Sequence, residues 1–175
     1  MSRMDALLSG RYLVVAFSDL PMPYQLALVR YLAIEGSDWD DFTMTEAGAS
    51  DAEVNEALRH EMPQYLEAYG DYHFGIAEIP TKDFQRVVMS DEEVRRDFGD
   101  WETYHKWFMG HGAMPSHAST DRWPVLLSSQ DDDDVLQDGW QRLHSYVRDG
   151  HSTIPAVFYP EKRHLHQVPA LLTKH

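Results

Sequence analysis

The chain has 175 residues, a net charge of −14 at pH 7 and no cysteine. A hydrophobic fraction of 43% is ordinary for a folded protein, and the length suffices for one domain with a proper core. The lack of cysteine excludes disulfides, thiolate metal sites and thiol catalysis. So acidic a chain is not suited to coating duplex DNA, which needs cations, but it can attract basic protein surfaces.

The first apolar run covers residues 12–17 and has no signal-peptide pattern around it. We find no stretch approaching the length of a membrane span, and the lack of cysteine fits the reducing cytoplasm, where we expect the protein.

Helical and strand patterns alternate along the first half of the chain. Ser50 with Glu53, and Ser90 with Glu93, have the spacing of a capping box, so both serines are predicted helix N-caps. Pro63 is expected to kink or divide the helix that follows Ser50. In order, the patterns predict a strand at 11–17, a helix at 24–34, a loop or edge strand at 38–45, a helix from 51, a strand at 72–79 and a short helix ending at 98.

The second half begins with an aromatic stripe at 101–108, which is predicted to be a helix packed on the core. Residues 110–122 have no periodicity and predict a long loop, while residues 161–175 form a basic, histidine-bearing tail expected to lie across the surface. Strands at 125–127 and 135–137 are predicted to form a hairpin. The class is therefore α/β (α+β) with a mixed sheet, in a single domain over 1–175.

Residues 135–158 are predicted to form a strand, a helix and a second strand. Trp140, Leu143 and Val147 recur at helical spacing, and Gly150 stands where the helix should end. Asp138 and Gln141 have capping-box spacing, so the helix is predicted to begin at Asp138. We expect 135–137 and 154–158 to be near-parallel strands of one sheet, joined by a right-handed crossover.

Arg142 lies in the first turn of that helix, where the exposed amides disfavour a cation. A phosphate at the helix start would reverse this cost, because amides and an arginine fork both bind anions. Alternatively, Arg142 points to solvent or pairs with one of the acids before it. On the phosphate interpretation, Arg142→Ala weakens nucleotide binding and leaves the melting temperature almost unchanged.

A resemblance to a known superfamily is carried by Gly139-Trp140-Gln141-Arg142, which follows a strand at 124–127 and precedes Ile154-Pro155. This run resembles the Gly-x-x-Arg box of the ParB/sulfiredoxin superfamily, over about the last third of the chain. The resemblance implies a ParB/sulfiredoxin-like fold with its phosphate-site core at 124–160. It also implies binding of a nucleotide or single-stranded nucleic acid, by a nucleotide hydrolase or nuclease using a nucleoside triphosphate with Mg²⁺. The implied phosphate-binding residues are Asp138, Gly139, Trp140, Gln141 and Arg142, with Asp138 also the candidate to hold the divalent ion.

The box departs from the well-known members. Sulfiredoxins carry a catalytic cysteine where Trp140 or Gln141 stands here, so their redox chemistry and any redox cofactor are excluded. ParB proteins carry Gly-Glu-Arg-Arg, so Trp140 replaces an acid and Gln141 an arginine. The altered box and acidic surface favour a second hypothesis, an inactive inhibitory module acting on a conjugative DNA-transfer or secretion machine. Small plasmid-borne proteins of this fold that suppress conjugative or oncogenic DNA transfer are similar in layout.

Other patterns predict no metal site. The Asp131–Asp134 run fails as a calcium loop, because Leu136 and Ser145 occupy liganding positions, and it predicts a solvated hairpin tip instead. The histidines form no HExxH motif. His117 is the one candidate we name for a catalytic base, and the catalytic residues are otherwise unassigned. His144 is two residues from Arg142 and is expected to face another side of the helix.

Overall fold

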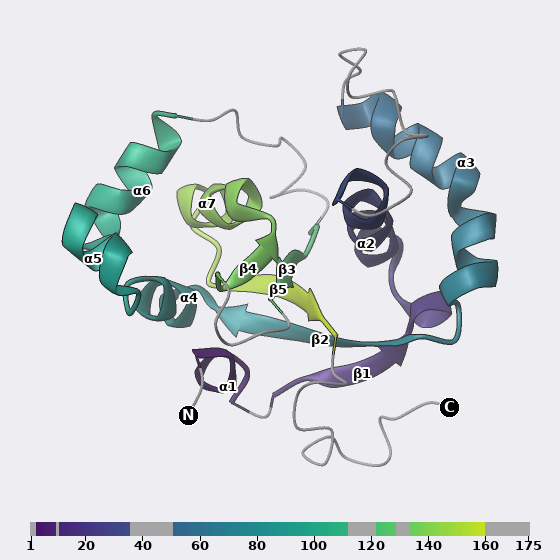
Figure 1. Ribbon diagram of the computed structural model, residues 1–175, viewed down its shortest axis with the longest axis horizontal. Helices are drawn as coiled ribbons and strands as arrows, with labels where there is room; N and C mark the ends of the chain where they lie inside the picture. Colours follow the sequence, from purple (N-terminus) through teal and green to yellow (C-terminus); the bar gives the residue numbers. More distant parts are fainter. Residues whose placement is uncertain (1–2, 10, 36–50, 112–121, 129–133, 160–175) are drawn as a thin grey trace.

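The computed structural model describes residues 3–9, 11–35, 51–111, 122–128 and 134–159. A five-stranded sheet of order β1-β2-β5-β3-β4 lies at its centre (Figure 1). Among the described strands, β3 and β5 are parallel and the other neighbours are antiparallel, which confirms the α/β class with a mixed sheet. The strands are β1 (Leu13–Ala16), β2 (His73–Pro80), β3 (Val125–Leu127), β4 (Leu136–Asp138) and β5 (Thr153–Phe158).

Helices cover both faces of this sheet. Figure 1 shows α2 and α3 side by side on one flank, with α4, α5 and α6 on the opposite flank and α7 beside β3 and β4. No described helix is long and apolar enough to cross a membrane. The helices are α1 (Arg3–Leu8), the 3-10 turn η1 (Phe17–Asp19), α2 (Met22–Glu35), α3 (Asp51–Tyr69), α4 (Thr81–Val88), α5 (Glu92–Phe98), α6 (Trp101–Met109) and α7 (Trp140–Arg148).

Successive side chains of each strand point to opposite faces of the sheet, so the core is divided into two clusters. On β2, Phe74 faces the cluster with α2 and α3, whereas Ala77 and Ile79 face the cluster with α1, α4, α6 and α7. The period of two places successive side chains on opposite faces of the sheet, so a strand buried on both faces is apolar almost throughout. This is why 72–79 and 154–158 are recognisable as strands from their composition.

The unit at 135–158 has its predicted elements but not its predicted geometry. β4, α7 and β5 are present, and both strands belong to one sheet. The near-parallel arrangement is wrong, because β3 lies between them, antiparallel to β4 and parallel to β5. β4 and β5 therefore run in opposite senses, and the right-handed crossover rule for parallel strands does not apply to them. The predicted hairpin of β3 and β4 is confirmed, with an irregularity in register between Leu126 and Leu127.

The predicted cap at Ser90 is wrong by one residue. Asp91 is the N-cap of α5, and its carboxylate accepts from the backbone N–H groups of Glu93 and Val94. The Ser90 hydroxyl instead donates to the carbonyl of Val87, at the end of α4. Asp91 and Ser90 could both accept from the first amides of α5. Asp91 does so, while Ser90 bonds to the end of α4. Ser50 lies outside the described residues.

Other differences are local. α3 continues through Pro63 without dividing, and Leu58 and Met62 are buried as predicted. The first strand is confirmed but shorter than predicted, because Phe17 already begins the turn η1. α1 and α4 are helices that the sequence patterns did not predict. The interpretations of 38–45, of 112–121 in the predicted long loop with His117, of Asp131–Asp133 in the hairpin tip and of the tail at 161–175 lie outside the described residues.

Candidate functional site

The site predicted from the sequence is the turn that joins β4 to α7. Gly139 is the N-cap of α7, not Asp138, and it has the left-handed φ of 103°. A Cβ there would lie 3.2 Å from the Cα of Val125, so the turn also needs glycine to approach β3 closely. The predicted start at Asp138 is thus wrong, because the chain can reverse against β3 only at the glycine. Asp138 is the last residue of β4.

Arg142 is buried, with 7% of its surface exposed. Its guanidinium donates to the carbonyl of Pro124 and to the Oδ2 atom of Asp138, the latter at 2.5 Å. Burial lowers the pKa of Arg142, while the charge of Asp138 raises it and that of Arg30 lowers it again. The alternative in which Arg142 pairs with a preceding acid therefore describes this geometry. Its guanidinium joins the chain before β3, the end of β4 and the first turn of α7.

The remaining residues of the box lie at the surface or half-buried. Gln141 is exposed, and Trp140 is partly buried against the core cluster on its side of the sheet. Helix α2 lies beside this turn, because Gln137 donates to the Tyr31 hydroxyl at 2.8 Å. The charge of Arg30, also on α2, is close enough to affect the pKa of Arg142. The charges of two arginines thus act at this turn of an otherwise acidic protein.

The start of α7 has neither a side-chain cap nor an acidic residue in its first turn within the described chain. Helices α5 and α6 contrast with it, since Asp91 and Asp100 cap them and glutamates occupy their first turns. First-turn amides without such partners leave a partial positive charge at the helix start. The arrangement can accept an anion, although the carboxylate of Asp138 stands close by.

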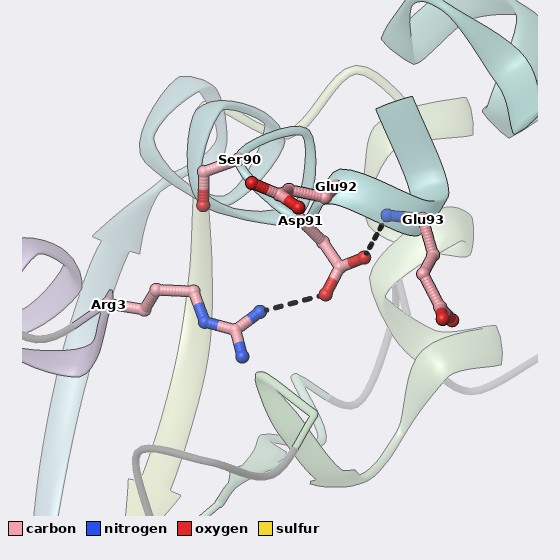
Figure 2. Close-up of a pocket in the computed structure, with 5 residues that line it drawn as sticks. All are labelled: Arg3, Ser90, Asp91, Glu92 and Glu93. Carbon is pink, nitrogen blue, oxygen red and sulfur yellow. Dashed lines mark hydrogen bonds and ion pairs between the residues drawn. The ribbon is translucent and has the colours of Figure 1, made fainter. Parts of the chain in front are cut away.

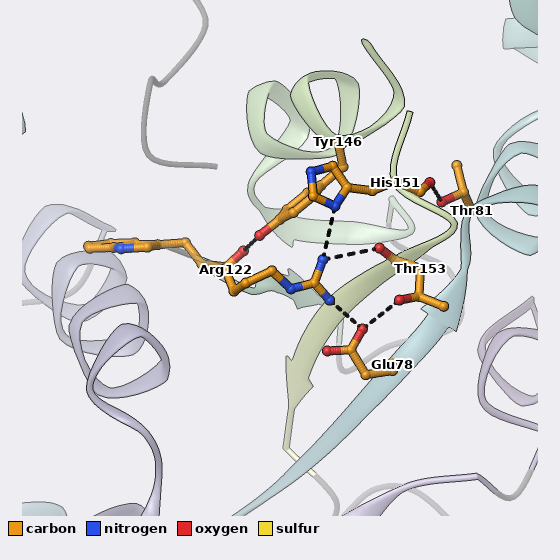
Figure 3. A network of polar contacts seen from close by, with 7 residues as sticks. Glu78, Thr81, Arg122, Tyr146, His151 and Thr153 are labelled. Carbon is orange, nitrogen blue, oxygen red and sulfur yellow. Dashed lines mark hydrogen bonds and ion pairs between the residues drawn. The ribbon is translucent and has the colours of Figure 1, made fainter. Parts of the chain in front are cut away.

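A second group of polar side chains surrounds Arg122 (Figure 3). Arg122 forms an ion pair with Glu78 at 2.6 Å and donates to the Thr153 carbonyl at 3.4 Å. Its Nη1 lies 3.4 Å from Nδ1 of His151, and its guanidinium lies over the ring of Tyr146 at 5.4 Å. Arg122 itself has a left-handed φ of 54°, which is uncommon for a residue with a side chain.

The charges of this group act on two tyrosines. Burial and the charge of Glu78 raise the pKa of Tyr24 to about 12, partly offset by Arg122. Burial likewise raises the pKa of Tyr146, whose hydroxyl donates to the Trp123 carbonyl at 2.7 Å. The polar side chains come from β2, β5, α7 and the segments that precede β3 and β5, so no local motif in the sequence marks them. We regard the group as a clamp that fixes these elements, since the fork of Arg122 is occupied by protein partners.

A pocket of about 290 Å³ is lined by Arg3 and by the residues 90–93 before and within α5 (Figure 2). Asp91 there accepts from Arg3 at 3.2 Å. The Val94 amide, then the Glu93 amide and Arg3, lower the pKa of Asp91. Three carboxylates in one small pocket repel phosphate, so this pocket does not suit the predicted ligand. Within the described residues, no group of three or more histidine or acidic side chains is placed to hold a metal ion.

Comparison of the chain with protein-family models, with characterised proteins and with solved structures found no match. The ParB/sulfiredoxin-like resemblance therefore stays a prediction from the box residues.

Proposed function

We propose that this protein binds a phosphate-bearing ligand, a nucleotide or the backbone of single-stranded nucleic acid, at the first turn of α7. The observation that carries the proposal is the open start of that helix, whose first turn has no acid and whose cap makes no side-chain hydrogen bond in the described part of the chain. Backbone amides at a helix start are a general anion-binding arrangement. A nucleotide ligand fits the predicted cytoplasmic location.

The structure changes the role that we assign to Arg142. Its guanidinium holds the turn in place, because the side chain is buried and donates to Pro124 and Asp138 within the protein. A second cation acts on this turn from α2, since the charge of Arg30 lowers the pKa of Arg142, although the Arg30 guanidinium also donates to Asn55 of α3 at 3.5 Å. The phosphate would then lie against the amides of Trp140 to Arg142.

Metal-assisted turnover has weaker support than binding. Asp138 is a single carboxylate already paired with Arg142, and Mg²⁺ prefers several oxygen ligands in octahedral geometry. The described residues of this turn therefore do not make a protein-built Mg²⁺ site, and Mg²⁺ would enter on the phosphates of the nucleotide. We derive no hydrolytic or nuclease step from this turn.

Calorimetric titration with ATP, CTP and short single-stranded DNA, each with and without Mg²⁺, tests the proposal. Gln141→Glu is the informative variant, because Gln141 is exposed and a first-turn acid strengthens the helix while it repels phosphate. We expect affinity to fall roughly tenfold or more, the effect of about 1.4 kcal/mol. Gln64→Glu makes the same charge change at an exposed position of α3 and should leave affinity unchanged. Equal effects of the two variants, or no binding by the wild type, would refute the site.

One observation favours the second function, an inhibitory module that binds a protein of a DNA-transfer machine. Trp107 on α6 is 46% exposed, and its ring lies 5.0 Å from that of Phe98 and 4.7 Å from that of His111. Exposed aromatic anchors are enriched at protein interfaces. If this function holds, Trp107→Ser should abolish suppression of plasmid transfer in donor cells while Gln141→Glu retains it. The reverse result would favour the phosphate site.

A further inference from the structure

Two histidines meet at the contact between α6 and α7. The Nδ1 atoms of His105 and His144 are 2.7 Å apart, a hydrogen-bonding distance. His144 has no exposed surface, and its ring is stacked at 3.9 Å on Phe108 and at 5.2 Å on Trp101. Its Nε2 atom has no hydrogen-bond partner within the described residues. His105 is partly exposed at the edge of the same contact.

This geometry determines where the protons lie at neutral pH. A neutral imidazole carries one N–H, and the short contact has room for one hydrogen between the two Nδ1 atoms. If His105 donated it, the N–H of His144 would be its buried Nε2, a donor without an acceptor. Orphaned buried donors are rarer than unsatisfied acceptors. His144 therefore donates from Nδ1 to His105, and the bare Nε2 of His144 is buried without a hydrogen-bond partner within the described residues.

Either protonation destroys this arrangement. A second proton on His105 goes to its Nδ1, which opposes two N–H groups unless His144 moves its own proton to Nε2. That shift leaves a buried donor without an acceptor among the described residues. A second proton on His144 goes to Nε2, which puts a charge into an apolar enclosure without an acceptor. The ring faces of Trp101 and Phe108 attract a cation, but this attraction is weaker than the cost of burying an unsolvated charge.

We propose that the His105–His144 pair is a pH-sensitive latch that holds α6 against α7 when both rings are neutral and releases it on acidification. Helix α5 should move together with α6, since the ring of Phe98 on α5 packs against that of Tyr104 on α6, with 5.0 Å between the ring centroids. Release uncovers the rings of Trp101 and Phe108, which extends the aromatic surface around Trp107.

The neighbouring groups do not offset the protonation cost. In the described part of the chain, the titratable side chains packed on His144 are His105 and Tyr104, both from α6. Asp134 is close enough to raise the pKa of Tyr104. On the sheet side of α7, β3 contributes apolar residues alone. Burial, and then His105, lower the pKa of His144 to about 3, and burial lowers the pKa of His105.

The sign of the pH dependence follows from these directions. A histidine whose pKa is lowered in the packed state takes up its proton more readily when it is released. The packing of α6 on α7 is therefore complete at pH above the ordinary histidine pKa, and it weakens as pH falls toward the lowered pKa of the packed state. For His144 alone, the ratio of packed to released protein should fall about 25-fold between pH 7 and pH 5.

Tryptophan fluorescence and near-UV circular dichroism against pH should show the release of α6 in the wild type, with far-UV signal largely kept. His144→Phe preserves the stack on Phe108 and removes the proton site, so it should abolish the transition. His60→Phe, at an exposed position of α3, is the matched control and should titrate as the wild type does. A wild-type signal that stays flat to pH 5, or a transition kept by His144→Phe, would overturn the latch.

Imidazole nitrogen NMR of the wild type gives a measurement that does not depend on any variant folding. At neutral pH we expect His144 to carry its hydrogen on Nδ1, the tautomer that free histidine disfavours. A hydrogen on Nε2 of His144 would contradict the latch directly.

Discussion

Replacing Arg142 with alanine should destabilise the protein, which reverses the expectation drawn from the sequence alone. The side chain is 7% exposed and donates to a buried stretch of chain at Pro124 as well as to Asp138. Its removal leaves the Pro124 carbonyl without this charged donor, a loss of roughly 1.5–3 kcal/mol. Asp138 has a side chain 40% exposed and can recover water, so its half of the pair adds only about 0–1 kcal/mol.

The expected total is about 2–4 kcal/mol, which for a chain of this size lowers the melting temperature by roughly 4–16 °C. Thermal unfolding followed by far-UV circular dichroism measures it. Arg148→Ala is the matched control in the same helix, because that arginine is exposed and pairs with the adjacent Asp149. It should change stability by less than about 0.5 kcal/mol. Arg142→Lys keeps the charge but not the fork, so it should fall between the two.

A melting temperature of Arg142→Ala equal to that of Arg148→Ala would refute this reasoning. Arg142 would then contribute nothing to the joint of β3, β4 and α7, and its guanidinium would be free to serve a ligand. The original sequence-based expectation would stand.

Three further outcomes follow from local geometry. Asp91→Ala should lower the free energy of unfolding by about 1 kcal/mol in urea unfolding, and Ser90→Ala by less, because Asp91 caps α5. The stabilising contribution of Asp91 should also disappear as pH falls through its lowered pKa. Gly139→Ala should cost about 2 kcal/mol or more, since φ is 103° and the new methyl group meets β3, and an unchanged denaturation midpoint would contradict the turn. Tyr24 and Tyr146 have raised pKa values, so the stability of the fold should fall as pH rises above the ordinary tyrosine pKa, up to about 12 for Tyr24. Near-UV titration of tyrosinate should find both side chains still protonated at a pH where exposed tyrosines ionise.

The sequence by itself determined the elements whose signal is local. Apolar composition marked β2 and β5, and the spacing of Trp140, Leu143 and Val147 marked α7. These signals depend on the period of a helix or a strand, which neighbouring residues report directly. Gly139 was recognised as part of the turn, although its role as the N-cap was assigned to Asp138.

The tertiary structure decided what depends on residues far apart in the chain. The relative direction of β4 and β5 is one case. It depends on β3, which lies between them, and no residue pattern within 135–158 indicates that a third strand is inserted there. The environment of Arg142 is another, since the carbonyl that binds it is 18 residues earlier at Pro124. The pairs Arg122–Glu78 and His105–His144 span 44 and 39 residues. Their chemistry exists only after the sheet and helices bring them together, because a side chain's pKa and partners are set by its neighbours in space.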